Sequence, residues 1–272
     1  MKIKYPQKFY SYRYNRNNKI SCCRYVINNK GMGDRKKFAI KNTYTTHYSH
    51  VNLNNNEFSI VSIEEDNFPP EYFFFSEYLT DIINPEEIWG KGLFLLNLYN
   101  GAVNIDLFNN EWDSNVKFTR LDNWVTNENL TPFSTENILP INPFPENLQT
   151  ENESKEMLKR TNFITYSSFL AKSESDVLSL LLLAGNDLDW VTLYAIYDTL
   201  KYYSQDFDKL ISICGYSKND IKAFTGTANN FGLLGINSRH GEMGWSQPKI
   251  TKSLFDSKKM ILEMAKIYIE SK

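Results

Sequence analysis

Residues 93–108 of the chain have the sequence LFLLNLYNGAVNIDLF. Two apolar runs, at 94–99 and 102–107, flank the pair Asn100-Gly101. Asn-Gly readily takes the positive backbone angles of a two-residue turn, and between apolar runs it is the strongest short-range signal for a β-hairpin. We therefore predict a hairpin over 93–108.

Short strands are predicted on the N-terminal side of this stretch. Residues 37–41 and 57–63 alternate apolar with polar side chains, which is typical of half-buried strands. The aromatic cluster at 71–83 fits a short helix and a buried strand equally well. These elements predict a β-rich α+β domain over residues 1–129.

The composition changes after residue 129. Residues 130–156 contain four prolines and many Asn, Thr and Glu side chains, which is typical of a linker or of an extended segment that wraps a domain. A chain of 272 residues is long enough for two cores. We therefore place a domain boundary at 130–156 and predict a helical domain over 157–272.

Helical periodicity dominates this second domain. Apolar residues recur at i, i+3, i+4 and i+7 in two stripes, which we interpret as core faces: Trp190, Leu193, Tyr194 and Tyr197, and Ile261, Met264, Ala265 and Tyr268. The longest apolar run, 177–184, is far shorter than the ~20 residues of a membrane-spanning helix. It predicts a buried helix, and we expect no membrane partner.

Helix starts and stops are also marked in the sequence. A capping-box pattern, Ser followed by Asp three residues later, occurs at Ser173 with Asp176, Ser217 with Asp220 and Ser253 with Asp256. Gly185 and Gly215 are placed where helices should end. The predicted fold class is thus α+β, with a β-rich N-terminal half that contains the Asn-Gly hairpin and an all-α C-terminal bundle of about five helices.

The net charge of −2 conceals a strong asymmetry. Residues 1–50 carry 12 basic side chains and one acidic side chain, a net charge of +11, whereas residues 51–150 carry 3 basic and 16 acidic ones, a net charge of −13. The basic stretch fits a nucleic-acid-binding arm, and it also fits a segment that packs on the acidic one. We favour packing, because apolar and aromatic residues such as Tyr5, Phe9 and Tyr10 interrupt the basic ones.

Composition and the N-terminal residues bear on class and compartment. With 42% apolar and 23% charged residues, the chain has the composition of a globular protein. Its first residues lack the apolar stretch of a secretory signal. The adjacent Cys22 and Cys23 are badly placed to bridge each other. We expect a cytoplasmic protein with reduced thiols and leave its oligomeric state open.

Metal and cofactor signatures are weak. His47 and His50 with Cys22 and Cys23 are potential zinc ligands, but adjacent cysteines depart from the usual two-residue gap. The pair Gly31 and Gly33 lacks the third glycine and the helix of a dinucleotide-binding loop. We therefore expect neither a metal nor a cofactor.

Four C-terminal segments carry a resemblance to a known family. They are the helix sequence DWVTLYAIY at 189–197, Thr227-Ala228-Asn229, the tetrad Ser238-Arg239-His240-Gly241, and Pro248 before the last helix. From about Val177 onward the chain resembles a widespread, uncharacterised bacterial helical domain with a "TAN" turn and an "ARHG" tetrad. Asp198 replaces a more usual Glu, and Ser238 replaces Ala. The resemblance implies a helical fold and a bacterial origin but no activity.

The sequence Arg239-His240-Gly241-Glu242 also matches the "RHGE" signature of histidine phosphatases. In that family the tetrad follows the first strand of a large α/β domain and requires a second histidine far downstream. Here the remaining chain is predicted to be helical and has no further histidine. We therefore reject a phosphatase, because the motif lacks its structural context.

A second enzymatic hypothesis is a metal-independent ribonuclease of the HEPN type. Its signature is an Arg and a His that are separated by four to six residues, whereas Arg239 and His240 are adjacent. A rearranged site that uses His240 and Arg239 as catalytic residues, with Asn229 or Asn230, stays the alternative, since a histidine beside a fixed cation suits acid–base chemistry near neutral pH.

Arg239 is distinguished by composition as well. It is the only Arg among residues 161–272, which contain 11 Lys, and it adjoins the only His of that region. A planar guanidinium selects carboxylate or phosphate, so the partner is a ligand or an internal Asp. Our ligand-binding candidates are Arg239, His240, Asn229 and Asn230. We predict a binding, sensing or scaffold protein with a protein or nucleic-acid partner.

Overall fold

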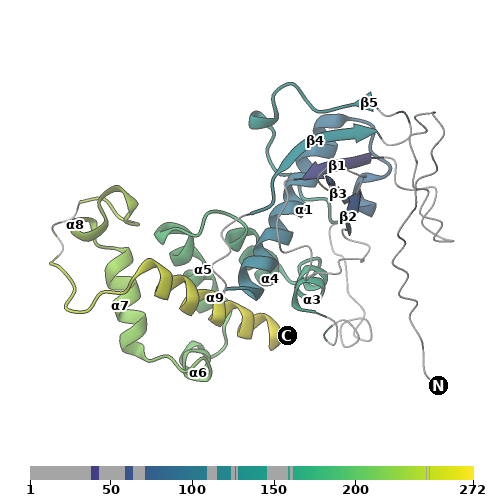
Figure 1. The fold of residues 1–272 in the computed structure, drawn as a ribbon. Helices are drawn as coiled ribbons and strands as arrows, with labels where there is room; N and C mark the ends of the chain where they lie inside the picture. The colour runs from purple at the N-terminus through teal and green to yellow at the C-terminus, as the bar shows by residue number, and fades with distance from the viewer. Residues whose placement is uncertain are drawn as a thin grey trace, which may run out of the picture. The chain divides into compact units, whose positions relative to one another are not determined.

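The computed structural model describes residues 38–42, 59–63, 71–108, 115–123, 126, 128–145, 159, 162–242, 244 and 246–272. Residues 35–272 form one compact unit. Its described part consists of a small sheet and a set of helices (Figure 1). The predicted α+β class is confirmed at this level.

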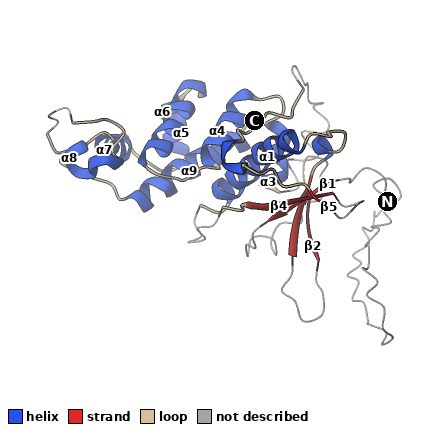
Figure 2. Cartoon of the chain, turned by 90° about the horizontal axis from the view of Figure 1, so that it is seen from above, coloured by secondary structure: helices blue, strands red, loops and turns tan. Residues whose placement is uncertain are grey.

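Among the described residues, five strands form an antiparallel sheet in the order β2-β3-β1-β4-β5 (Figure 1). Figure 2 shows these strands in red and the helices in blue. Their bounds are β1 Phe38–Asn42, β2 Ser59–Ile63, β3 Glu71–Phe75, β4 Phe118–Asn123 and β5 Glu128–Asn129. The strands predicted at 37–41 and 57–63 are confirmed as β1 and β2. Residues 71–83 contain both a strand, β3, and a short 3-10 helix, η2 Glu77–Leu79.

The predicted hairpin over 93–108 is wrong. Pro85–Asp106 form one helix, α1, and Asn100-Gly101 lies inside it. Asn84 caps the helix by accepting a hydrogen bond from the Glu86 N–H, and Pro85 occupies the first turn.

The helical period of the segment outweighs its local turn signal. Leu95, Leu98, Tyr99 and Ala102 stand at i, i+3, i+4 and i+7, and all four are fully buried. A hairpin would point alternate residues of this stretch toward solvent, whereas the helix buries the whole stripe.

Gly101 has a packing role instead of a turn role. Helix α4, Ser175–Ala184, crosses α1 so closely that a Cβ atom at position 101 would lie 1.9 Å from the Leu181 carbonyl oxygen. On the other side of the crossing, a Cβ at Gly185 would lie 2.1 Å from the Asn97 carbonyl oxygen. Only glycine allows the two backbones to approach to this distance.

Asparagines of α1 and of the segment after it satisfy the last carbonyl groups of α4. Asn97 Nδ2 donates to Leu182 O at 3.1 Å, and Asn104 Nδ2 donates to Ala184 O at 2.8 Å. Asn115 Nδ2 donates to Gly185 O at 3.0 Å. These carbonyls have no partner within their own helix, so the contacts cap α4 from outside.

Asn100 connects α1 to the sheet. Its side chain donates to Val116 O at 3.0 Å and accepts from Val116 N at 2.9 Å, in a buried position. This pair of bonds holds the chain just before β4. On the sheet, Ile40 is paired with Phe74 and Leu121, so the three buried side chains share the face on which α1 packs.

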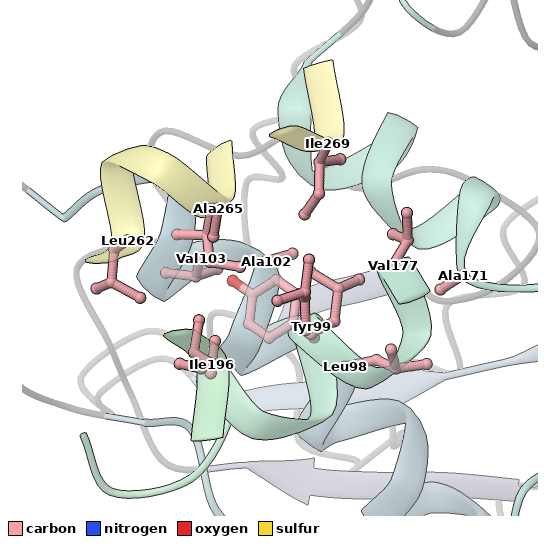
Figure 3. Packing of buried hydrophobic residues seen from close by; sticks show 14 of the residues in the cluster. Leu98, Tyr99, Ala102, Val103, Ala171, Val177, Ile196, Leu262, Ala265 and Ile269 are labelled. Atoms are coloured by element: carbon pink, nitrogen blue, oxygen red, sulfur yellow. The ribbon is translucent and has the colours of Figure 1, made fainter. Parts of the chain in front are cut away.

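Most buried apolar residues of both predicted halves form one hydrophobic cluster, and Ala39, Phe73 and Phe75 of the sheet form a small second one. Figure 3 shows the centre of the large cluster, where Leu98, Tyr99 and Val103 of α1 meet side chains of α4, α5 and α9. Helix α5 is Trp190–Tyr203 and α9 is Leu254–Glu270. Both predicted stripes contribute to this core, with Leu193, Ile261, Met264 and Ala265 fully buried.

The C-terminal region contains more helices than predicted. The remaining described ones are α3 Phe163–Leu170, α6 Phe207–Ile213, α7 Lys218–Ala228, the short α8 Phe231–Leu234, and the 3-10 helix η4 Gly235–Asn237. The apolar run at 177–184 lies in α4, as predicted.

Two of the three predicted capping boxes correspond to helix N-caps. Ser217 caps α7 with the full reciprocal pair, and Ser253 caps α9 by accepting from the Asp256 N–H. The prediction at Ser173 is wrong, because the N-cap of α4 is Glu174 and Asp176 has another role. Gly185 directly follows α4, and Gly215, with a φ of 75°, follows α6.

Asp176 of α4 binds side chains at the C-terminal end of α9 and just after it. Its carboxylate accepts hydrogen bonds from the Tyr268 hydroxyl and the Lys272 ammonium group, and Oδ1 accepts from Val177 N at 2.9 Å. Burial alone would raise the pKa of Asp176, but the bonds from Lys272 and Tyr268 outweigh it and lower that pKa. Burial and the contact with Asp176 raise the pKa of Tyr268 to about 12.

The described part of the predicted linker, 130–145, wraps the N-terminal part of α1. Ile141 N donates to Gly90 O at 3.0 Å, and the Phe144 ring contacts the Phe94 and Tyr78 rings edge to face. This segment includes the 3-10 helix η3 Thr135–Asn137. In the described part of the chain, no helix combines the length and the apolar character needed to span a bilayer.

Replacing Gly101 with Ala should lower the free energy of unfolding by about 3 kcal/mol, because α1 and α4 must separate to admit the methyl group. The gain in helix propensity, about 1 kcal/mol, is too small to compensate. Urea denaturation measures the difference. Gly241→Ala is the control, since a Cβ there meets nothing within 4 Å. A Gly101→Ala protein as stable as Gly241→Ala would contradict the crossing.

The division into domains 1–129 and 157–272 stays a prediction that limited proteolysis tests. We expect cleavage within 130–156, at its Pro- and Asn-rich sequence. Because α1 and α4 share one core, we also expect the two fragments to elute together in size-exclusion chromatography. A helical fragment that elutes alone would indicate two separate cores.

Candidate functional site

The four segments that carry the family resemblance converge on the last turn of α7. Arg239, which follows η4, donates its backbone N–H to the Ala228 carbonyl at 2.8 Å. The Pro248 ring packs against Gly226, where an added Cβ would lie 3.3 Å from Pro248 Cβ. Lys252 N donates to Thr227 Oγ1 at 3.0 Å. Both ends of the loop 238–253, at Arg239 and at Lys252, therefore contact the C-terminal end of α7.

The Arg239 side chain reaches from this loop to α5. Its guanidinium carbon lies 3.9 Å from the centre of the Tyr194 ring, the distance of a stacked cation–π contact. Nη2 donates to Asp198 Oδ2 at 3.3 Å. Tyr194 and Asp198 are four residues apart on α5 and so share one face of the helix.

His240 lies beside this guanidinium. Its Nε2 atom is 3.5 Å from Arg239 Nη1, and its carbonyl oxygen is in hydrogen-bond contact with the Ser238 hydroxyl. The two candidate catalytic residues are thus adjacent in space as well as in sequence. Both are partly exposed.

Asn229 and Asn230 occupy different environments. Asn229 is the C-cap of α7, and its Nδ2 atom lies 3.4 Å from the Tyr194 hydroxyl, while its buried Oδ1 has no hydrogen-bond partner among the described residues. Asn230 is 3% exposed. It caps α8 through Leu233 N at 3.0 Å and donates to Ser246 O at 3.2 Å. Asn229 belongs to the site, whereas the Asn230 side chain is used by the fold.

A cluster of aromatic rings packs against Tyr194. Tyr194 stacks on Phe224 of α7, with ring centroids 5.9 Å apart, and contacts Tyr197 edge to face. Trp190 also stacks on Phe224, with ring centroids 6.4 Å apart. Burial raises the pKa of Tyr197. These rings hold the Tyr194 ring in place, and the guanidinium of Arg239 packs on that ring.

Sequence reasoning found Arg239, His240 and Asn229 but missed the partners of Arg239. Tyr194 was interpreted as a core residue and Asp198 only as a departure from a family pattern. Their i, i+4 spacing was the available signal. An exposed acid one turn after an aromatic residue matches what a planar cation requires.

Other candidates give no site in the described residues. Cys22, Cys23, His47, His50, Gly31 and Gly33 and the basic residues before 38 lie outside them. The described residues contain no group of three metal-binding side chains. Burial, with a contribution from Glu263, raises the pKa of the Cys214 thiol to about 11, so this thiol stays protonated and unreactive.

Replacing Arg239 with Lys should lower the free energy of unfolding by about 1 kcal/mol, because a half-exposed stacked guanidinium contributes on this scale. The charge is kept, so the loss reports the planar contacts. Lys218→Ala, which breaks an exposed ion pair with Asp208, is the control and should change stability less. Equal stabilities of Arg239→Lys and wild type in thermal and urea unfolding would show that the contact does not brace the loop.

Comparison with known proteins identifies no relative: no protein-family model, no curated protein sequence and no solved structure matches the chain. The resemblance of residues 177–272 to a bacterial helical domain therefore stays a prediction.

Proposed function

We propose that the protein is a binding, sensing or scaffold protein in which the helical region contacts the partner through the surface around Arg239. The observation that supports this proposal is the placement of Arg239. Its backbone N–H bonds to α7, its guanidinium stacks on Tyr194 of α5, and its Nη2 donates to Asp198.

These three contacts make the end of α7, α5 and the loop 238–253 one braced surface. A fixed surface on rigid helices is what partner recognition requires, since it reduces the entropy lost on binding. The bacterial setting implied by the resemblance suggests host defence or a mobile element as the context. In that setting the partner is a protein, and a nucleic acid is the second class to test.

The alternative is a ribonuclease in which His240 and Arg239 are catalytic. One observation favours it: His240 Nε2 lies 3.5 Å from Arg239 Nη1, and both side chains are partly exposed. A histidine beside a fixed cation can exchange a proton with an RNA substrate while the cation stabilises the phosphate.

The variant His240→Ala separates the two functions. For a binding protein we expect that neither the wild type nor His240→Ala cleaves RNA, that both melt at the same temperature, and that the wild type retains a partner in affinity capture from the producing organism. RNA cleavage by the wild type that disappears in a normally folded His240→Ala protein would establish the ribonuclease instead, because such a residue acts only in the transition state.

A further inference from the structure

The Arg239 guanidinium has hydrogen-bonding capacity that the protein does not use. An arginine side chain has five N–H groups. One is directed to Asp198 and one toward His240, so three have no protein partner in the described part of the chain. The side chain is 35% exposed, and these donors are therefore accessible to a ligand.

The stacking on Tyr194 prepares this group for binding. The Arg239 guanidinium carbon lies 3.9 Å from the centre of the Tyr194 ring, and this contact restricts the side chain, so less conformational entropy is lost when a ligand binds. The chain uses Lys for every other cation between 161 and 272. Unlike the ammonium group of lysine, the planar guanidinium of arginine can bind two oxygen atoms of one oxyanion with two parallel hydrogen bonds.

Asp198 is a weak internal partner for this guanidinium. Its contact with Arg239 is a single bond of 3.3 Å, at the long end of the range for a charged pair, and its side chain is 49% exposed. An ion pair in this environment contributes little stability. A second oxyanion can therefore replace Asp198 at low cost, with repulsion from the displaced carboxylate as the main penalty.

The geometry points to an oxyanion-binding site at Arg239, in which a carboxylate or phosphate group of the partner takes the place of the Asp198 carboxylate on the Tyr194-stacked guanidinium. This inference rests on the proposed binding function and names the chemistry of the group that is bound.

The test is a titration of the full chain with inorganic phosphate and, separately, with acetate at constant ionic strength. The Nε–H signal of Arg239, identified by its loss in Arg239→Lys, reports binding in NMR spectra. We expect a saturable shift for at least one anion. We also expect Asp198→Asn to bind that anion about fivefold more tightly, because a unit charge within ~4 Å of the ligand is removed. Phosphate alone would indicate a phosphorylated partner, and acetate alone a carboxylate.

Asp208→Asn is the matched control. It removes an acid from another exposed ion pair, Lys218–Asp208, whose cation is a lysine, and it should leave the titration unchanged. A non-saturable shift in the wild type overturns the inference, as does equal tightening in Asp208→Asn. The wild-type titration decides the question even if Asp198→Asn fails to fold.

The experiments distinguish a failure of the oxyanion site from a failure of the proposed binding function. If neither anion binds while the wild type still retains its partner, only the oxyanion site is lost. If RNA cleavage depends on His240, the proposed binding function is lost whatever the titration shows.

Discussion

The Leu181 carbonyl oxygen lies where a side chain at position 101 would begin, and the arrangement of the helices follows from this contact. Because the α1 and α4 backbones touch, the asparagines of α1 can reach the carbonyl groups at the end of α4. From the same helix, Asn100 holds the chain that leads into β4. One helix therefore connects the sheet to the helical core.

The sequence predicts the elements of the fold better than their assembly. Periodicity located β1, β2, α4, α5 and the last helix, because each has a simple apolar pattern. It predicted a hairpin at Asn100-Gly101, where a pair with high turn propensity lies inside α1 and Gly101 allows the close approach of α4. The stripe Leu95, Leu98, Tyr99 and Ala102 was visible in the sequence, but the need for glycine arises from α4, which lies about 80 residues away. Such a tertiary requirement overrides local propensity.

In the candidate site, too, single residues were predicted from the sequence, whereas the contacts between them were not. Its conspicuous residues, Arg239 and His240, were found because an isolated arginine beside an isolated histidine is a compositional anomaly. Their partners were missed because Tyr194 and Asp198 are ordinary members of an amphipathic helix. Their role exists only once the loop 238–253 is folded back on α7 through Ala228 and Thr227. The sequence alone does not show that this loop folds back on α7.

The position of α1 in the chain also affects biosynthesis. Its buried surface packs against Ile40 of β1, which is made earlier, and against β4, α4 and α9, which are made later. The bonds from Asn97 and Asn104 span 85 and 80 residues of sequence, so α1 completes its contacts only when distant parts of the chain come together. While the ribosome is still making the C-terminal helices, α1 exposes an apolar surface that has no partner. Until α4 and α9 have been made, this surface is the part of the nascent chain most prone to aggregation.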